Sequence, residues 1–403
     1  MLQDSHLREH GNLKLSLTAP IVAHPAALFW HKRTLIISDS VMYSFYISLF
    51  KSLLSLVFAR LYRPQHVPKR DLSGQTAIVT GANSGIGLSI AIALAAQGAN
   101  VYLACRNADR GSAAVEQVVA HCGDSSKTRV RCRILDVGDL SSVKAFCAQW
   151  EKEGCGSIDM LVHNAGIASP PVGSSPVTKG GLDIIYTTNF LGSFLLTHLL
   201  ESRLSPTARV VFTSSTGSYS ATAHLLHKNS SDALKASEPG IVARVLARGK
   251  VLLGVEAESS APAYGLSKAQ QVLFAALLQQ RFDTQASHSH NQSTGRTAHA
   301  FTPGFTSTSI FSKFEATWQI WLTNPLFAVL KTTEKFIAVD TDEGAKSGAW
   351  LAARGDELGQ MQQGGAFWER MQKRTSIADI MDERRKLDEW KTWERDAGVV
   401  WKV

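Results

Sequence analysis

Cysteine is scarce in this chain of 403 residues, and the spacings typical of metal sites are missing. There are five cysteines, an odd number, and no two of them are arranged as C-x-x-C or in another metal-binding pattern. We therefore expect neither a disulfide framework nor a metal site. The cysteines are interpreted as small buried apolar residues of a protein in a reducing compartment.

A strong net charge is also missing from most of the chain. The net charge is +8, but residues 1–70 hold nine Lys or Arg and three Asp or Glu, which is +6, so the rest carries only +2. Because the excess is local and flanks an apolar segment, it favours a membrane surface and argues against a nucleic-acid partner. Apolar residues make up 44% of the chain, which is enough for a sizeable core.

Only one long apolar run stands out, residues 41–59, and we predict a membrane-associating or spanning helix over residues 41–63. The run has one charged residue, Lys51, and basic residues follow it, which would leave the large domain on the cytosolic side. Lys51 near the centre of a span costs about 2.5–3.5 kcal/mol. A helix lying in the membrane interface and a helix buried against the domain are therefore the alternatives. Residues 1–40 are predicted to be a poorly defined extension.

Strand and helix patterns alternate after a linker at residues 64–72. Short apolar runs are followed by segments with helical spacing, and this order is typical of a parallel sheet covered on both faces. We predict one doubly wound (Rossmann) α/β domain over residues 73–353, with six strands between Thr76 and Thr302. A seventh strand is allowed but not placed. Residues 354–403 are predicted to be a helical extension whose tryptophans serve packing.

The segment "TGANSGIG", Thr80 to Gly87, lies where a dinucleotide fingerprint is expected, after the first strand and at the start of a helix. Glycines allow the backbone to approach a pyrophosphate, and the N-terminus of the helix offers unpaired N–H groups. The spacing G-x-x-x-G-x-G resembles that of the short-chain dehydrogenase/reductase family. The resemblance extends over residues 71–353, and the N-terminal segment and "ACRN" resemble the membrane-associated retinol dehydrogenase-like branch.

Arg106 occupies the position that selects the cofactor, at the end of the second strand and 19 residues beyond Gly87. An acidic residue there would repel a 2′-phosphate, whereas a guanidinium pairs with it. We therefore predict NADP(H), with Asn107 as a neighbouring contact. The alternative is a solvated surface arginine.

The segment "YGLSK" supplies the candidate acid/base group. Tyr264 and Lys268 are four residues apart, so on a helix they share one face. An adjacent ammonium favours the phenolate, and we expect it to lower the phenol pKa from its usual value near 10. Such a pair can donate a proton in carbonyl reduction and accept one in alcohol oxidation.

The family resemblance implies further site residues. Ser215 would bind the substrate oxygen, with Ser214 as the alternative, and Asn189 would support a water that links the lysine to solvent. The cofactor would contact Gly81, Asn83, Ser84, Gly85, Ile86, Gly87, Arg106, Asn107, Asp136, Val137, Asn164, Ala165, Gly166, Tyr264, Lys268, Pro303, Gly304, Thr306 and Thr308.

The insertion between Ser215 and Tyr264 and the C-terminal extension depart from the usual pattern of this family. Ser215 and Tyr264 are 49 residues apart, so residues 217–260 form an insertion. It is interpreted as an element that shapes the pocket or binds a partner, with a disordered surface insertion as the alternative. Residues 309–338 are apolar and aromatic, and the resemblance implies a lid over the substrate, with a pair of ordinary core helices as the alternative.

These observations predict an NADP(H)-dependent oxidoreductase that interconverts a lipophilic ketone or aldehyde and its alcohol. Reduction of an activated C=C bond and a membrane-tethered nucleotide-binding scaffold without turnover are the alternatives. We expect a membrane-associated protein with a cytosol-facing domain, for which the endoplasmic reticulum or a lipid droplet provides a surface. A homodimer is compatible with the sequence.

Overall fold

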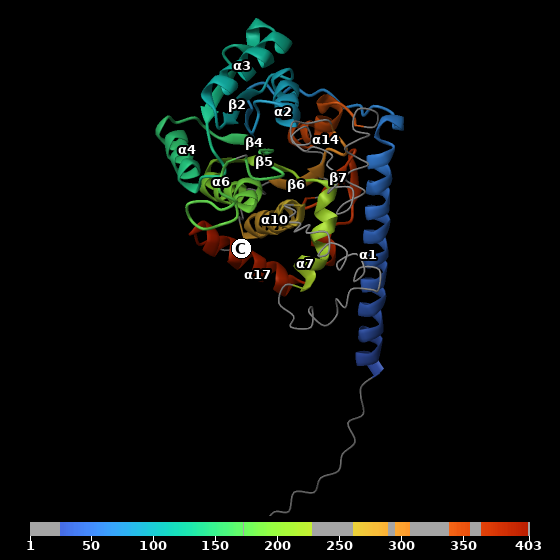
Figure 1. Cartoon of the computed structure of the whole chain (residues 1–403). Helices are drawn as coiled ribbons and strands as arrows, with labels where there is room; N and C mark the ends of the chain where they lie inside the picture. Colours follow the sequence, from blue (N-terminus) through green and yellow to red (C-terminus); the bar gives the residue numbers. More distant parts are fainter. Residues whose placement is uncertain are drawn as a thin grey trace, which may run out of the picture.

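The computed structural model describes residues 25–171, 173–227, 261–288, 295–306, 338–354 and 364–401, with only the backbone described over 25–39. A single eight-stranded sheet forms the centre of the domain, in the order β3-β2-β1-β4-β5-β6-β7-β8 (Figure 1). The strands are β1 Thr76–Thr80, β2 Asn100–Cys105, β3 Val130–Ile134, β4 Ile158–His163, β5 Leu204–Thr213, β6 Thr297–Thr302, β7 Phe367–Glu369 and β8 Gln372–Arg374.

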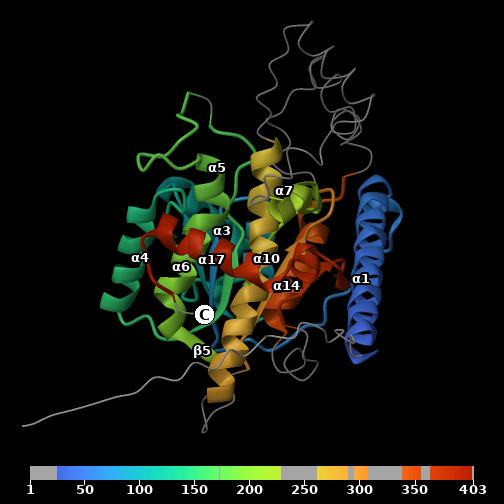
Figure 2. The ribbon, with the colours of Figure 1, turned by 90° about the horizontal axis from the view of Figure 1, so that it is seen from below.

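Helices cover both faces of this sheet, as the sequence predicts for a doubly wound domain (Figure 2). Neighbouring residues of β1 point to opposite faces, so Ile78 joins one core while Ala77 and Val79 join the other. The first core includes α4 Leu140–Lys152, α6 Gly192–Leu200 and α10 Ala261–His288; the second includes α2 Gly85–Ala95, α3 Ala108–Cys122 and α14 Thr341–Ala353.

The first seven strands are parallel, and β1 lies between β2 and β4. The strand order therefore reverses beside β1, which is the topological switch point where open α/β sheets bind ligands. The predicted Rossmann class is confirmed.

The sheet is nevertheless larger than predicted, because the C-terminal extension contributes two strands. The seventh strand is β7, and an eighth, β8, pairs with it in the antiparallel direction. Arg370 and Met371 form the turn between them with φ angles of 49° and 59°. Three-residue strands are too short for a hydrophobic pattern, and neither turn residue is the glycine that such a turn usually contains.

The C-terminal helices pack on the domain, and the interpretation of their tryptophans as packing residues is confirmed. Trp390 and Trp393 in α17 Glu383–Ala397 are buried, as is Trp401 beyond it. Their rings contact Phe194 of α6 and Phe274 of α10. The short helix α16 Ile377–Ile380 precedes α17.

The apolar spacing of residues 181–204 is typical of one long helix, but the structure divides this segment. It contains α5 Ile184–Tyr186, the π-helix η3 Thr187–Leu191, α6 and the 3₁₀ turn η4 Glu201–Arg203. The division lies where this segment comes close to the backbone after β3: a Cβ at Gly192 would lie 1.9 Å from the carbonyl oxygen of Val137. A wide turn in this place is typical of functional sites.

The N-terminal apolar helix α1, Pro25–Val57, begins before the predicted residue 41 and is followed by the 3₁₀ turn η1 Ala59–Leu61. Among the described residues, one helical window, Ser40–Val57, is long and apolar enough to cross a membrane. The helix nevertheless lies along the side of the domain, beyond β7 (Figures 1 and 2).

Candidate active site

The glycine turn leads from β1 into α2 and forms a cradle at the switch point. Gly81 and Gly85 have φ angles of 63° and 59°, which side chains other than glycine rarely adopt. A Cβ at Gly81 would lie 2.8 Å from the Cα of Ala165, and one at Gly87 would lie 2.7 Å from the carbonyl oxygen of Gly81. A Cβ at Gly85 would meet no atom of the described chain within 4 Å. The turn is therefore closely packed at its base and open at Gly85.

The segment after β4 supports this turn. Thr80 Oγ1 accepts hydrogen bonds from the backbone N–H groups of Asn164 and Ala165, at 2.9 and 3.1 Å. Asn164 Nδ2 donates to the carbonyl oxygen of Thr80 at 3.1 Å. These contacts hold the base of the turn, so the structure gives Asn164 and Ala165 a structural role beside the predicted cofactor role.

Two arginines follow β2, and Arg110 contacts the glycine turn. Arg106 is exposed after β2, and Asn107 caps α3 by accepting from the backbone N–H of Arg110 at 2.9 Å. With its amide oxygen turned toward the guanidinium, Asn83 accepts from Arg110 Nη2 at 2.9 Å. The sequence analysis did not select Arg110, which lies in the first turn of α3, three residues after the N-cap Asn107.

Other residues predicted to bind the cofactor lie at the edge of the candidate site or in the buried layer beneath it. Ser84 is the N-cap of α2, and Ile86 packs on the core of that face. Asp136 is half-buried after β3, and its Oδ1 accepts from the N–H of Gly138 at 2.9 Å. Val137 is buried beside it.

The two serines after β5 have different partners. Ser214 is buried, and its Oγ donates to the carbonyl oxygen of Lys268 at 2.7 Å. Ser215 Oγ accepts from the N–H of Gly217 at 3.1 Å and hydrogen-bonds the hydroxyl of Tyr264. The Ser214 hydroxyl thus hydrogen-bonds the backbone of α10, whereas Ser215 faces the phenol. The arrangement favours Ser215 over the alternative.

Tyr264 and Lys268 lie on one face of α10, with Lys268 Nζ 5.6 Å from the centroid of the tyrosine ring. Burial lowers the pKa of Lys268 to about 7, since the charged amine is poorly solvated there. Burial raises the pKa of Tyr264, and the hydrogen bond with Ser215 opposes that increase. The expected lowering of the phenol pKa by the lysine is therefore not what this structure shows, because desolvation affects both groups.

The lysine amine is linked to η3 by a side chain that the sequence analysis missed. Lys268 Nζ donates to the carbonyl oxygen of Thr213 at 2.8 Å and to Gln271 Oε1 at 3.2 Å. Gln271 Nε2 in turn donates to the carbonyl oxygen of Asn189 at 2.7 Å. Gln271 therefore joins the amine to the backbone of Asn189, while the water that the resemblance implies at Asn189 stays a prediction. Its position three residues after Lys268, one helical turn away, is the available signal.

The side chain of Asn189 holds the loop after β4 through two hydrogen bonds with the backbone of Ile167. Its Oδ1 accepts from the N–H of Ile167 at 2.7 Å, and its Nδ2 donates to the carbonyl oxygen of Ile167 at 2.9 Å. A Cβ at Gly166 would lie 3.1 Å from Asn189 Oδ1 and 3.4 Å from Lys268 Nζ. Glycine at position 166 thus allows this loop to approach the amine.

The segment after β6 joins the serine segment through Thr302, another residue that the sequence analysis did not select. Thr302 Oγ1 accepts from the N–H groups of Thr216 and Gly304, at 3.1 and 3.2 Å. Gly304 has a φ angle of 73°. Thr306 is buried and donates to the carbonyl oxygen of Pro303 at 3.0 Å, which places its hydroxyl within the loop.

Several predicted features lie outside the described residues. These are Thr308, residues 228–260 of the insertion, and residues 309–337 of the expected lid.

Comparison with known proteins agrees with this geometry. A family model for short chain dehydrogenases matches residues 75–231. Mouse retinol dehydrogenase 12 is 33% identical over 260 residues, which cover 64% of this chain and 70% of that protein. Mouse retinol dehydrogenase 11 is 42% identical over 149 residues, covering 36% and 45% of the two chains.

The fold comparison gives the same result. The crystal structure of an uncharacterized protein from Mycobacterium paratuberculosis superposes with a TM-score of 0.54 at 25% identity, covering 84% of this chain and 97% of that one. The glycine turn, the Ser–Tyr–Lys arrangement and these relatives lead to one conclusion: the chain belongs to the short-chain dehydrogenase family.

Proposed function

We propose that this protein is an NADP(H)-dependent oxidoreductase that interconverts a lipophilic ketone or aldehyde and its alcohol. The observation that carries the proposal is the contact of the Ser215 hydroxyl with Tyr264, one helical turn from the buried amine of Lys268. These groups lie after β5 and on α10, at the carboxyl edge of the sheet where the family binds its cofactor.

The residues at this edge fit a nicotinamide dinucleotide. The glycine turn is open at Gly85, and the N–H groups at the start of α2 are suited to a pyrophosphate. Arg106 and Arg110 provide two guanidinium groups for a 2′-phosphate, and this pair supports NADP(H) over NAD(H). Residues proposed for the remaining contacts are Asp136 and Val137 for adenine, Lys268 for the ribose, and Pro303, Gly304 and Thr308 for the carboxamide.

The bound nicotinamide supplies or accepts the hydride, and the chain supplies the proton transfer. Ser215 donates a hydrogen bond to the substrate oxygen and holds it beside Tyr264. In reduction the Tyr264 hydroxyl gives its proton to that oxygen, and in alcohol oxidation the phenolate takes the proton back. Tyr264 is therefore assigned as the acid/base group.

Lys268 acts on this step from the next turn of α10. With a pKa of about 7, the amine is charged in a substantial fraction of molecules at neutral pH. Its charged form favours the phenolate, and Gln271 fixes its position through the carbonyl oxygen of Asn189. Gln271 is a positioning residue in this scheme.

The lipophilic substrate class and the membrane association are supported by the names of the relatives, retinol dehydrogenases 11 and 12, and by the apolar helix α1. We propose a membrane-associated protein whose catalytic domain faces the cytosol, on the endoplasmic reticulum or a lipid droplet. A homodimer remains a prediction from the sequence.

The test is consumption of NADPH and of NADH by the purified full-length chain with a panel of hydrophobic aldehydes, ketones and enones. We expect oxidation of NADPH with aldehydes or ketones and an alcohol as the product. Turnover restricted to enones with a saturated carbonyl product would indicate C=C reduction instead. Binding of NADPH without turnover of any panel member would favour the scaffold alternative and contradict the proposal.

A further inference from the structure

The helix α1 has two different sides. A buried stripe consists of Phe45, Ser48, Ser52, Ser55 and Ala59, and an exposed stripe consists of Tyr43, Tyr46, Phe50, Leu53 and Val57. Both sets advance by three and four residues, so each follows one side of the helix, and the two sides are about half a turn apart. Three serines of this apolar helix, Ser48, Ser52 and Ser55, therefore face the domain.

The centre of the buried stripe binds a buried carboxylate of the C-terminal extension. Ser52 Oγ donates to Glu369 Oε2 at 2.8 Å, and Ser55 Oγ donates to Glu369 Oε1. Glu369 is 0% exposed, and Arg374 Nε lies 2.9 Å from its Oε2. A buried carboxylate with this set of donors is strongly destabilised when one of them is withdrawn.

Contacts at both ends of the stripe extend this attachment. Ser48 Oγ accepts from the N–H of Thr375 at 3.0 Å, toward the start of the stripe. After α1, the guanidinium of Arg370 lies 4.8 Å from the ring centroid of Tyr62 and donates to the carbonyl oxygen of Arg63. We call residues 367–375, which comprise β7, β8, the turn between them and Thr375, the α1 seat, since they contact the chain between residue 48 and residue 63.

The seat occupies the segment that a membrane span would need. The candidate span is Ser40–Val57, and Ser48, Ser52 and Ser55 within it all contact the seat. Crossing a bilayer would place these hydroxyls in hydrocarbon and leave Glu369 without two donors, and both changes are unfavourable. Both effects therefore favour the helix remaining on the domain.

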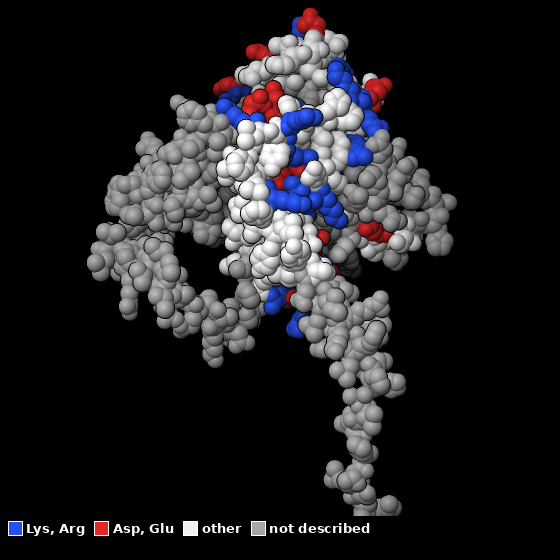
Figure 3. Space-filling model, turned by 90° about the vertical axis from the view of Figure 1, so that its right-hand side faces the viewer, with Lys and Arg blue, Asp and Glu red and all other residues white. Residues whose placement is uncertain are grey.

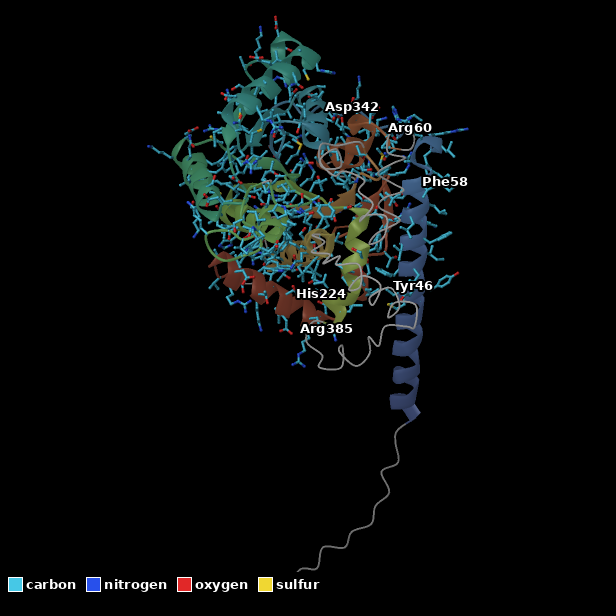
Figure 4. All side chains as sticks on the ribbon, in the orientation of Figure 1. Tyr46, Phe58, Arg60, His224, Asp342 and Arg385 are labelled. Atoms are coloured by element: carbon cyan, nitrogen blue, oxygen red, sulfur yellow. The ribbon has the colours of Figure 1, made fainter. Side chains whose placement is uncertain are left out.

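The exposed stripe is nevertheless unusually apolar for a protein surface. Eight of the twelve large apolar side chains exposed among the described residues belong to α1 or the turn after it. Figure 3 shows the uncharged surface of this side, bordered by Lys and Arg, and Figure 4 shows Tyr46 and Phe58 on the outer side of α1. Lys51, Arg60 and Arg63 are exposed around it.

We propose that α1 lies flat in a membrane surface, with the exposed stripe in the lipid and the buried stripe on the α1 seat, so that it does not span the bilayer. The proposal rests on the membrane association proposed above and specifies its form. An apolar stripe with tyrosines and flanking basic residues matches the chemistry of an interface containing anionic headgroups.

This arrangement also brings the active site close to the lipid. The ring of Phe45 lies 5.3 Å from that of Tyr219. Tyr219 belongs to η5 Thr216–Ala221, the turn that begins directly after Ser215. A lipophilic substrate dissolved in the bilayer would therefore have a short path to the serine.

The first experiment is flotation of the full-length protein with preformed vesicles of phosphatidylcholine, with or without phosphatidylserine. The double variant Phe50→Ser, Leu53→Ser should reduce the vesicle-bound fraction about tenfold, because two large apolar side chains are removed from lipid. The control Ile134→Ser, Val400→Ser removes two exposed apolar side chains elsewhere and should float like the parent. Phosphatidylserine should strengthen binding, and salt should reverse that gain.

The second experiment determines the topology. Asp39→Cys and Arg63→Cys place reporters at the two ends of the segment, and each is treated with a membrane-impermeant maleimide on sealed vesicles. Labelling is compared with that of the parent chain, which has cysteines of its own. Both reporters should react from the outside. Protection of residue 39 together with labelling of residue 63 would establish a span and overturn the proposal.

Two further outcomes would also overturn it. If the parent does not float and the exposed-stripe variant converts a dimer to a monomer, the stripe binds a second copy of the chain. If the parent floats and the exposed-stripe variant floats equally well, another surface binds the lipid. NADPH consumption with a water-soluble carbonyl is measured on the same samples, so loss of lipid binding is distinguished from loss of catalysis.

Discussion

The amine of Lys268 shows how much of the site depends on side chains that no motif includes. "YGLSK" predicts Tyr264 and Lys268 on one helix face, and the structure has them there. The link from the amine through Gln271 to η3 could not be predicted, since it requires a π-helix that presents the carbonyl oxygen of Asn189. The same limit applies to Thr302, whose role depends on two loops from different strands.

Replacing Gln271 with leucine should lower both activity and stability. The change leaves the Asn189 carbonyl without this donor and removes one acceptor of the Lys268 amine, at about 1–3 kcal/mol for each buried group. We expect a lower kcat and a shift of its pH profile, measured with NADPH and a carbonyl substrate.

The adjacent Gln270 provides a matched control, because its buried Oε1 has no hydrogen-bond partner in the described structure. Gln270→Leu should therefore have a near-neutral effect on thermal unfolding and leave the pH profile unchanged. Equal kinetic effects of the two variants would contradict the role assigned to Gln271.

The depressed pKa of Lys268 predicts a specific dependence of stability on pH. The pKa is about 7 in the folded chain against an ordinary value of 10.5, so between these pH values the unfolded chain binds more protons. The contribution of this group to the free energy of unfolding must rise with pH across that window. The advantage of the parent over Lys268→Met should therefore grow from pH 7 toward pH 10 in urea denaturation. A constant difference would show that the amine is not desolvated.

Arg106 should determine the preference between cofactors. Arg106→Asp replaces a phosphate-binding guanidinium with a repelling carboxylate, so we expect kcat/KM for NADPH to fall at least about tenfold while that for NADH is maintained. Arg384→Asp makes the same change of charge at an exposed position of α17 and should leave the ratio as it is. An unaltered ratio in the Arg106 variant would remove the proposed phosphate contact.

Among the elements, α1 and the β7–β8 hairpin depend on each other although they come from opposite ends of the chain. The sequence predicted an apolar helix and left its environment open. Ser48, Ser52 and Ser55 follow one side of it, and this spacing is the signal that a docked side was present. The partner could not be predicted, because a three-residue strand that carries a buried Glu369 has no recognisable pattern.

Glu369→Gln should test the α1 seat as a structural element. The change removes the charge that Ser52, Ser55 and Arg374 surround, and breaking a buried ion pair costs about 3–5 kcal/mol. We expect a loss of this order in the free energy of unfolding and faster proteolysis of α1. Glu151→Gln, in an exposed pair with Arg203, should change stability by less than about 1 kcal/mol. Similar losses in the two variants would contradict the seat.

At the scale of the whole molecule, the sheet with its two cores is the part that the sequence predicts best. Six strands with alternating helices define the parallel sheet, and the glycine turn marks its switch point. The size of the sheet was underestimated, since β7 and β8 are added after β6 by the C-terminal extension. That extension therefore completes the sheet and holds the N-terminal helix, in addition to covering α6 and α10 with its tryptophans.

The central claim is that Tyr264 gives a proton to the oxygen of a carbonyl substrate and takes one from the hydroxyl of an alcohol substrate. One kinetic comparison tests this claim most directly. Single-turnover oxidation of NADPH is followed for Tyr264→Phe and for Tyr102→Phe, a control on β2 with the same chemical change. We predict a loss of about 10²–10⁴-fold in the rate for Tyr264→Phe, with NADPH binding retained, and a near-parent rate for Tyr102→Phe. Turnover at the parent rate in Tyr264→Phe would contradict the account.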